Sequence, residues 1–551
     1  MIQAHLEQQA SEIHDQFSDD VTSLERWTSV RDRYKREYLY MMGLWPMPEK
    51  TPLQGTVTGM LEGDGFVVDM LHYQSRPGLY VTANLYRPAK VNRGERLPAV
   101  LYLCGHSSRS RNGHKSAFQS HPIWFARRGY VCLIVDALQR GEIAAIHHGT
   151  YREGRWWWHA RGYTPAGVEY WNGVRGIDYL IGRPDVDPER IAMTGISGGA
   201  ATFWITAADE RMKAAVPVSG IADLPSYVSN RVTNGHRDCM FLHNTFHWPW
   251  TRIAALVAPR PMLFVNSDHD RIFPMDANER VINRLERFYS RYGKGDLVDS
   301  ERDLVTGPRD AWLHPIESEK LRVFPSDADI PKDELPPLLD EHFVPMVSVA
   351  QPSVGQFAQW KRKLLAELRR VSFNYFPKRV PPANLTEMVK TASVVRIETE
   401  PGIHFRLERA VDSTGQPRRV LLLVGDEGAD ARDAQWVVRS RQAGNVLFQL
   451  QTRGVGDSRW TGTDPPNYIK RSHVLLGRTV DSGRVWDVVA VARYLRSEFK
   501  NKLPVYVMGR RGRAVFAAYA ALVEQDIAGV IASRPPMSHM EPGSPQLLNV
   551  L

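Results

Sequence analysis

The sequence predicts an α/β protein with a doubly wound, mostly parallel sheet, followed by a second, degenerate and truncated domain of the same kind. Three observations support this class. Continuous apolar runs of strand length alternate with helical stretches, as in parallel sheets that are buried on both faces. A glycine-rich turn around a serine joins one apolar run to a helix. A similar strand, turn and helix recur near the end of the chain at nearly the same spacing.

The first predicted strands are antiparallel, and those that follow are parallel. Residues 65–75 and 79–88 alternate apolar and polar positions, which predicts two antiparallel strands. Residues 97–105 and 129–137 are continuous apolar runs, which predict buried strands of a parallel sheet. Residues 121–129 lie between these runs and predict a crossover helix.

A long helix and further strands come next. We expect a helix at 166–183, and then a strand, a tight turn and a helix within 190–208. The apolar runs at 214–220 and 261–268 predict two more strands of the same sheet. Residues 357–373 have the spacing of an amphipathic helix with a basic face.

The length of the chain predicts more than one domain. Its 551 residues are too many for one ordinary hydrophobic core, so we expect two domains or more. Residues 1–50 predict an N-terminal helical segment on the outside of the first domain, which we assign to 51–376. The stretch 377–384 has the composition of a linker, and 385–551 form the second domain.

Composition excludes several classes of function. The formal charge of +9 comes from 70 basic and 61 acidic residues that are scattered along the chain, so we expect no nucleic-acid partner. No apolar run reaches the roughly 20 residues of a membrane span, so we expect no membrane partner. The N-terminus has no signal-peptide pattern, which predicts a cytoplasmic protein unless a signal has been removed. The three cysteines, Cys104, Cys132 and Cys239, do not suggest a disulfide scaffold, and the oligomeric state stays open.

The turn around Ser197 is the strongest chemical signal. Gly195 and Gly199 bracket it in the pattern Gly-x-Ser-x-Gly, between an apolar run and a helix. This is the pattern of the nucleophile elbow of α/β-hydrolases, in which a strained turn exposes the serine at the start of a helix. We therefore predict that Ser197 is a nucleophile; a glycine turn with a purely structural role is the alternative.

The second half of the chain repeats the spacing of the first. Gly129 precedes Gly195 by 66 residues, and Gly444 precedes Gly509 by 65, which indicates a tandem repeat. Arg511 takes the place of the serine, so we expect the second copy to be catalytically silent. Only 42 residues follow Gly509, so we expect its last strands to be missing. An anion held by the arginines at this turn is the alternative role.

A serine nucleophile needs a base, and the base needs a carboxylate that orients it. In this fold the acid follows the serine along the chain, at the end of a later strand. Asp270 meets this condition after the apolar run at 261–265, and the chain turns away directly after it. Asp268 is the fallback, and a turn capped by aspartates is the alternative.

The oxyanion hole needs two N–H donors. Gly198, directly after the serine, supplies one. The second is expected from the loop after an earlier strand, which contains Cys104, Gly105 and His106. His106 is also suited to line a substrate pocket or to cap this loop.

Residues rich in His, Trp and Tyr follow the second parallel strand, where lids lie in this fold. We expect His148, Trp157 and His236 to line the substrate pocket, because aromatic surfaces suit sugar or aryl groups. His243 and His247 have a spacing that can bind a metal on a helix. No matching acidic signature accompanies them, so we predict neither a metal nor a cofactor.

The sequence resembles a known family over residues 40 to 290, and more loosely beyond. It is similar to bacterial acetyl xylan esterase-like α/β-hydrolases, which are related to dienelactone hydrolases and prolyl-oligopeptidase-type enzymes. The stretches that carry this resemblance are LYLCGHS, GEIAAIHHGTY, RGYTPAGVEYWNGVRGIDYL, RPDVDPERIAMTGISGGA, GHRDCMF and AALVAPRPMLFVNSDHDRIFP. The resemblance implies that Ser197 is the nucleophile and Asp270 the acid.

The histidine that this resemblance implies is not in its expected place. The family has it in a Gly-Pro-His-x-Asp turn about forty residues after the acid, but here Arg309 follows Gly-Pro. Arginine stays protonated and cannot act as a base. A second alignment treats 299–308 as the remnant of a deletion that removed the turn. His314 is the nearest substitute and His342 the next, while lid histidines have no spacing argument in their favour.

We therefore predict a serine carboxylic ester hydrolase that acts through an acyl-enzyme on a small acyl ester, for example an acetylated carbohydrate. One alternative is a pseudoenzyme or binding protein with an impaired triad. A less favoured alternative is a prolyl-oligopeptidase-type peptidase, because no β-propeller repeat precedes the catalytic domain.

Overall fold

The structure is a computed structural model of the 551-residue chain. It describes residues 1–17, 22–107, 109–138, 141–146, 148–197, 201–238, 242–301, 315–335, 338–388, 393–411, 415–425 and 444–551.

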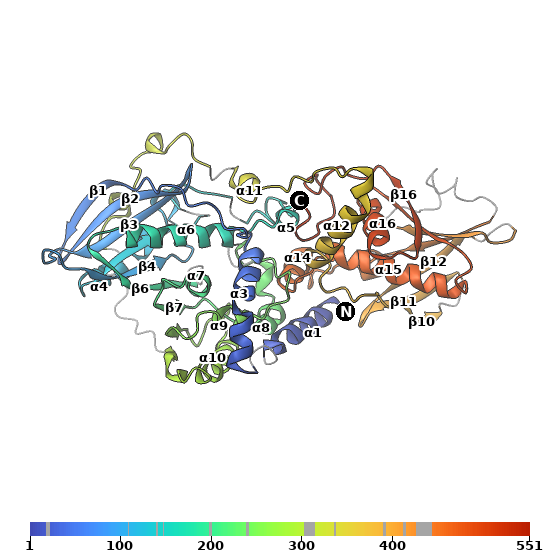
Figure 1. The fold of residues 1–551 in the computed structure, drawn as a ribbon, viewed down its shortest axis with the longest axis horizontal. Helices are drawn as coiled ribbons and strands as arrows, with labels where there is room; N and C mark the ends of the chain where they lie inside the picture. The colour runs from blue at the N-terminus through green and yellow to red at the C-terminus, as the bar shows by residue number, and fades with distance from the viewer. Residues whose placement is uncertain are drawn as a thin grey trace.

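Two β-sheets lie next to each other along the long axis of the molecule (Figure 1). The first has nine strands in the order β1-β2-β3-β5-β4-β6-β7-β8-β9. Strands β1 to β3 are antiparallel to their neighbours, and β5, β4, β6, β7, β8 and β9 run parallel. The bounds of these strands are Thr56–Gly63, Phe66–Arg76, Leu79–Pro88, Leu97–Leu103, Val131–Val135, Val186–Ile196, Ala214–Val218, Met262–Val265 and Val298–Glu301 for β1 to β9.

Both faces of this sheet carry apolar side chains, as the continuous runs predict. On β4, Leu101 and Leu103 pack on the face covered by α6 (Pro165–Ile181) and α7 (Ala201–Ala208). Val100 and Tyr102 alternate with them and belong to a separate cluster with α4 (Ser120–Ala126) on the opposite face. This alternation confirms the predicted doubly wound α/β class.

Local sequence explains where the longest helices of the first domain begin. Thr164 is the N-cap of α6 and accepts a hydrogen bond from the N–H of Ala166 at 3.3 Å, with Pro165 in the first helical turn. Ser23 caps α3 (Leu24–Met41) in the same way through the N–H of Arg26 at 3.2 Å. The remaining described helices of the first half are α1 (Ile2–Asp15), α5 (Trp158–Arg161), α8 (Leu224–Ser229), α9 (Trp250–Ala255), α10 (Met275–Ser290) and α11 (Leu339–His342).

The second sheet has seven strands, in the order β10-β11-β12-β14-β13-β15-β16. This is the order and strand direction of the first sheet from β1 to β7. Within the described residues it has no counterpart of β8 and β9. The bounds are Asn384–Met388, Val394–Glu400, Ile403–Val411, Arg419–Val424, Asn445–Leu450, Val505–Arg510 and Ile527–Ser533 for β10 to β16, with helices α14 (Pro466–Leu475), α15 (Val480–Glu498) and α16 (Gly512–Val523).

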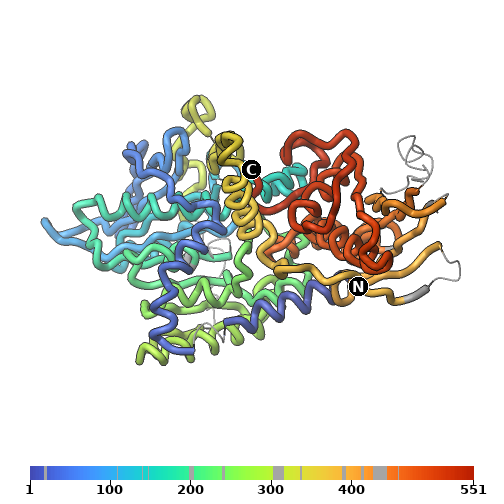
Figure 2. The backbone as a smooth tube through the Cα atoms, turned by 45° about the vertical axis from the view of Figure 1, so that its right-hand side comes forward, coloured from blue at the N-terminus to red at the C-terminus, as the bar shows by residue number. Residues whose placement is uncertain are grey.

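Both ends of the chain lie at the contact between the two halves (Figures 1 and 2). Helix α1 contacts α8 of the first half and α14 of the second. The last residues return to the first half, where the N–H of Asn549 donates to the carbonyl of His159 at 3.0 Å. Helix α12 (Phe357–Val371) connects the halves and occupies most of the predicted helix at 357–373.

In the first sheet, the structure adds two strands that the sequence patterns did not predict. Strand β1 is half-exposed at one edge of the first sheet, and β9 is a four-residue strand at the other. Residues 299–301, the start of the stretch interpreted as a deletion remnant, belong to β9. Among the described helices, none is long and apolar enough to cross a membrane.

Candidate active site

Ser197 lies in the sharp turn that follows β6. Its backbone φ is 56°, in the left-handed region that side chains other than glycine rarely adopt. The side chain is half-buried, and helix α7 begins four residues later. This strand, strained turn and helix are the elements predicted for a nucleophile elbow. Gly198, the expected first oxyanion donor, lies outside the described residues.

The loop after β4 lies directly against this turn. Strand β4 pairs with β6, and Leu103 is opposite Gly195. A Cβ atom on Gly105 would lie 2.7 Å from the carbonyl oxygen of Ile196, so only glycine allows the loop to pass this close. Residues 104–106 therefore lie next to the Ser197 turn, which is where the predicted second N–H donor of an oxyanion hole has to be.

The other residues of this loop differ in exposure. Cys104 is buried, and burial raises the pKa of its thiol well above the usual value, which keeps it uncharged. His106 is half-buried, and its ring packs edge to face on His114 with centroids 5.2 Å apart.

Asp270 follows β8 at the same edge of the sheet. The strand ends are in register, since Ile196 is opposite Val218 and Val218 is opposite Val265. Asp270 Oδ1 accepts hydrogen bonds from the N–H groups of Ile272 at 2.8 Å and Phe273 at 3.0 Å.

These two bonds fix the orientation of the Asp270 carboxylate. Among the described residues, its Oδ2 accepts no hydrogen bond and is available to another donor. Asp270 is half-buried, whereas Asp268 is exposed and makes no such contacts in the described chain. This geometry favours Asp270 over the fallback Asp268.

His314 lies outside the described residues, which end at Glu301 before it and resume at Pro315 directly after it. On one side, β9 ends at Glu301 next to β8. On the other side, Ile316 exchanges two hydrogen bonds with the side-chain amide of Gln119, at 2.8 and 2.9 Å. Pro315, the residue after His314, lines the same cavity of about 700 Å³ as Ile196, the residue before Ser197.

The second candidate base, His342, is exposed at the end of α11. Its neighbour Asp340 is buried and accepts hydrogen bonds from Trp158 and Arg155, both at 2.7 Å. No contact joins His342 to Ser197 or Asp270 within the described part of the chain. The position of α11 therefore gives no support to His342 as the base.

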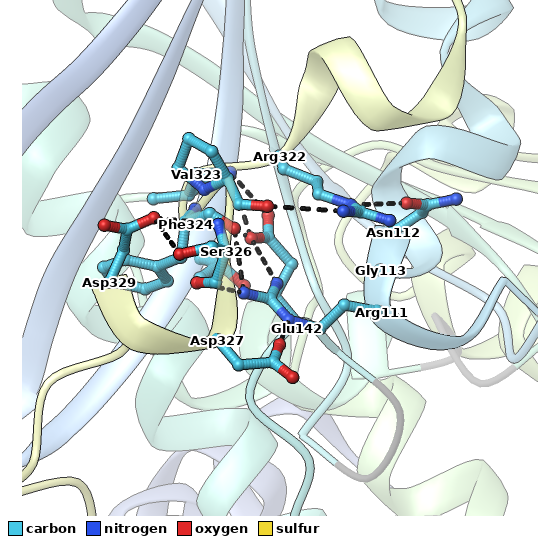
Figure 3. Close-up of polar contacts among 12 residues, drawn as sticks. Arg111, Asn112, Gly113, Glu142, Arg322, Val323, Phe324, Ser326, Asp327 and Asp329 are labelled. Atoms are coloured by element: carbon cyan, nitrogen blue, oxygen red, sulfur yellow. Dashed lines mark hydrogen bonds and ion pairs between the residues drawn. The ribbon is translucent and has the colours of Figure 1, made fainter.

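A buried ionic cluster anchors the segment that follows His314 (Figure 3). The carboxylate of Glu142 accepts hydrogen bonds from the N–H groups of Val323 and Phe324 and from Arg111 at 3.2 Å. Arg111 also donates to the carbonyl of Phe324 at 2.8 Å and to Asp327 at 2.6 Å.

Lys115 completes this cluster. It is fully buried between Glu142 and Asp136, whose Oδ2 lies 2.8 Å from its ammonium. The two carboxylates outweigh the effect of burial and raise the pKa of Lys115. The cluster joins the loops after β4 and β5 to residues 323–327.

The predicted pocket residues fall into two places. His148 and His236 lie near each other in the first half: His148 is buried with φ 60°, and His236 is hydrogen-bonded to the hydroxyl of Tyr227. Burial lowers the pKa of His236 to about 3, with further effects from Arg471 and His148. Trp157 instead lines a cavity whose other walls belong to the second half.

Arg471 was not singled out by the sequence patterns, yet it crosses from α14 of the second half to the pocket loop of the first. Its side chain is 2 % exposed. It donates hydrogen bonds to the carbonyls of Thr233 and His236 and to Asp238 Oδ1, and it lies 5.1 Å from the centre of the Tyr151 ring. No local pattern reveals this role, because the partners are more than 230 residues apart.

His243 and His247 do not lie on a helix. They belong to an irregular segment between residues 242 and 249, and their rings pack on different partners, His159 and Tyr375. Burial lowers the pKa of both to about 4. The helical spacing that prompted a metal interpretation is therefore absent. The described residues contain no cluster of three or more His, Cys, Asp or Glu side chains suited to a metal ion.

Comparison with known proteins agrees with this fold. Residues 116–298 match the prolyl oligopeptidase family, a stretch that includes Ser197 and Asp270 and ends before His314. The first domain has an α/β-hydrolase fold, and these findings support hydrolysis as its activity.

Individual relatives are distant. A Bacillus subtilis (strain 168) protein named as a hydrolase, YtaP, is 23% identical over 277 residues, which cover 48% of this chain and 89% of that protein. The solved structure of methylesterase BT1017 is 19% identical with a TM-score of 0.49, covering 64% of this chain and 80% of that one. A Bacteroides fragilis protein provisionally described as an acetyl xylan esterase is 16% identical with a TM-score of 0.40, covering 52% and 78%. These two structural likenesses are too low to carry an argument.

Proposed function

We propose that the first domain is a serine carboxylic ester hydrolase that acts on a small acyl ester, with an acetylated carbohydrate as the favoured substrate. The observation that carries this proposal is the strained turn at Ser197, in contact with the Gly105 loop on one side and in register with the strand that leads to Asp270 on the other. Nucleophile, oxyanion loop and acid thus start from one edge of one sheet.

In this mechanism Ser197 Oγ attacks the ester carbonyl carbon while a histidine takes its proton. The N–H groups of Gly198 and of the Cys104–His106 loop stabilise the negative oxygen that forms. The histidine then returns the proton to the departing alcohol. In the second stage the histidine takes a proton from water, which attacks the acyl-enzyme carbonyl; the bond to Ser197 Oγ breaks, the acid is released and the proton passes to Oγ.

We assign the base to His314. Three observations support this: its segment follows the last strand of the sheet, its neighbour Pro315 shares a cavity with Ile196, and the residues after it are held by Gln119 and the Glu142 cluster. Asp270, with one oxygen fixed by two N–H groups and the other available, orients this histidine.

The two halves form a catalytic and a degenerate hydrolase-like domain in this proposal, with 377–384 as the linker and 1–50 as an N-terminal helical segment. The shared order of seven strands supports a tandem repeat. The absence of a serine at Arg511 supports a silent second copy.

A fluorophosphonate probe and p-nitrophenyl acetate test the nucleophile. We expect the probe to label the full chain at Ser197, and Ser197→Ala to lose labelling and about a thousand-fold or more of hydrolysis. Ser219→Ala is the matched control, because Ser219 directly follows the neighbouring strand β7 and also has a positive φ, 44°. Equal labelling of all three proteins would contradict the assignment.

Two paired substitutions test the other members. Asp270→Asn should reduce kcat far more than Asp268→Asn, and His314→Ala far more than His342→Ala. If Ser197→Ala lost hydrolysis but His314→Ala did not, the base would have to be another histidine. Faster cleavage of a proline-containing peptide than of the acetate ester would replace the esterase by a peptidase.

A further inference from the structure

A cavity of about 560 Å³ lies between the two halves, at the turn that replaces the nucleophile elbow in the second. One wall is residues 153–157 of the first half, another includes Gly512 and Phe516 of α16, and a third is the C-terminal stretch 540–546. None of the residues proposed for catalysis lines it. Its volume is that of a small-molecule site, so it has room for a ligand of the size of one or two sugar rings.

Lys470, on α14, gives this cavity a positive charge that has no direct ion-pair partner among the described residues, although the carboxylate of Asp481 in the same wall acts on it from a longer distance. Its side chain is half-buried, and burial lowers the pKa of its ammonium group. No carboxylate in the described chain lies within 4 Å of its Nζ, which is instead 4.5 Å from the centre of the Trp156 ring.

Other cations of the wall are paired. Arg155 lies 2.7 Å from Asp340, and Arg484 lies 3.0 Å from Asp481. Burial outweighs the effect of Asp481 on Lys470, and a partly buried cation without a direct ion pair favours binding of an anion, because the anion replaces part of the lost hydration. Lys470 is therefore suited to pair with one negatively charged group of a ligand.

Aromatic rings form the apolar part of the same walls. Trp156 and Trp157 come from the first half, and Phe516 comes from α16 of the second. Flat aromatic faces bind the C–H face of a sugar ring while leaving its hydroxyl groups at the polar rim. Thr479 and Ser544 also line the cavity, but their hydroxyl groups already bond within the protein: Thr479 accepts from the N–H of Ser482 at 2.9 Å, and Ser544 donates to the carbonyl of Ser538 at 2.6 Å.

We propose that this cavity binds an acidic sugar, with its carboxylate against Lys470 and its ring against the tryptophans. The proposal does not depend on the catalytic assignment, since the site uses other residues. It gives the second half a function of its own, because Gly512, the residue after the position that corresponds to the nucleophile, becomes part of a ligand site.

Titration calorimetry on the full chain tests the site, using the Ser197→Ala variant so that no turnover interferes. Glucuronate and glucose are matched probes that differ in the carboxylate. We expect glucuronate to bind at least about ten-fold more tightly than glucose, and more weakly as salt is raised. Lys470→Met should lower the glucuronate affinity by about ten-fold or more, while Lys470→Arg retains binding.

Lys361→Met, an exposed lysine on α12, is the control and should bind as the parent does. Thermal melting confirms that each variant is folded. Equal affinity for glucose and glucuronate, no binding at millimolar glucuronate, or unchanged affinity in Lys470→Met would overturn the proposal. Tighter binding of inorganic phosphate or of benzoate would also overturn it, because the site would then select an anion or an aryl acid rather than a sugar.

Discussion

The two turns at Ser197 and Arg511 have nearly the same backbone but different chemistry. Their φ angles are 56° and 50°, and both lie between a strand and the helix that follows it: α7 begins four residues after Ser197, and α16 begins directly after Arg511. A Cβ atom on Gly509 would lie 2.3 Å from the carbonyl oxygen of Arg513, so the strand and helix pass too closely for any other residue. The elbow geometry therefore persists as a packing requirement without a nucleophile, and it is not by itself evidence of catalysis.

The two halves differ in the strands that follow the turn along the chain. The first sheet continues into β8 and β9, and the end of β8 carries Asp270. The second sheet has β16 as its last strand among the described residues. A serine placed in the second turn would thus have neither an acid nor a base beside it.

The largest effect is expected from exchanging the two turn residues. Ser197→Ala should lower p-nitrophenyl acetate hydrolysis by about a thousand-fold or more, because the nucleophile is removed. Adding Arg511→Ser to that variant should restore nothing, since the described part of the second sheet has no counterpart of β8, the strand that leads to Asp270 in the first. Recovery of even one per cent of the rate would show that the two turns are chemically equivalent.

Arg471→Met should have the next largest effect. It leaves the buried carboxylate of Asp238 without its cation and should cost about 3–5 kcal/mol of unfolding free energy. Denaturant unfolding measures this loss, and esterase activity should fall as the loop at 233–238 is released.

Arg493→Met is the matched control for that variant. Arg493 pairs with Glu524 at 3.1 Å inside the second half, so its loss should leave esterase activity unchanged. Equal effects of both variants on activity would mean that α14 does not support the pocket of the first half.

Gly509→Ala tests the packing explanation of the second turn. The added methyl group would force the strand and helix apart, which we expect to cost about 2–3 kcal/mol of unfolding free energy. At Gly462 a Cβ atom would meet nothing within 4 Å, so Gly462→Ala should have little effect. Equal stability of the two variants would refute the packing requirement.

The most gradual effect is a loss of stability in acid, which builds up over several pH units. Burial lowers the histidine pKa to about 4 for His5, His243 and His247, and to about 3 for His236 and His473. Below pH 6.5 the unfolded chain binds protons that the folded chain does not, so stability falls as the pH drops from about 6.5 toward 4. Each histidine contributes at most about 1.4 kcal/mol per pH unit.

Melting temperature measured between neutral and mildly acidic pH checks this slope. His473→Gln should flatten it, since that side chain no longer titrates. His342→Gln should leave it unchanged, because His342 is exposed on α11. If the dependence of the melting temperature on pH were the same in His473→Gln, the acid sensitivity would have to come from other groups.

Local sequence patterns were enough to predict most of the first sheet. The strands from β2 to β8, the helices α4 and α6 and the turn at Ser197 all follow from local runs of apolar residues and glycines. Strands β1 and β9 were missed because both lie at sheet edges, where half-exposed residues leave no continuous apolar run.

The contacts between distant segments had no local signal. Arg471 meets Thr233 across 238 residues, and Lys115 meets Glu142 through a fold that brings two loops together. Trp157 was assigned to a pocket by its residue type, but its position depends on how the second half packs against residues 153–157. The assignment of His314 as the base is a proposal, because sequence spacing and the packing of the following residues identify the segment in which the base lies but do not place its side chain.

Strand β16 has a further consequence for how this protein behaves in concentrated solution. Its counterpart β7 is flanked by β6 and β8, whereas β16 pairs only with β15 among the described strands. Ile531 is 41% exposed on it, and Ala528 and Ala532 are also exposed. An apolar edge strand offers a ready template for a strand of another molecule, so we expect self-association to begin here, and a charged residue such as Ile531→Lys to suppress it.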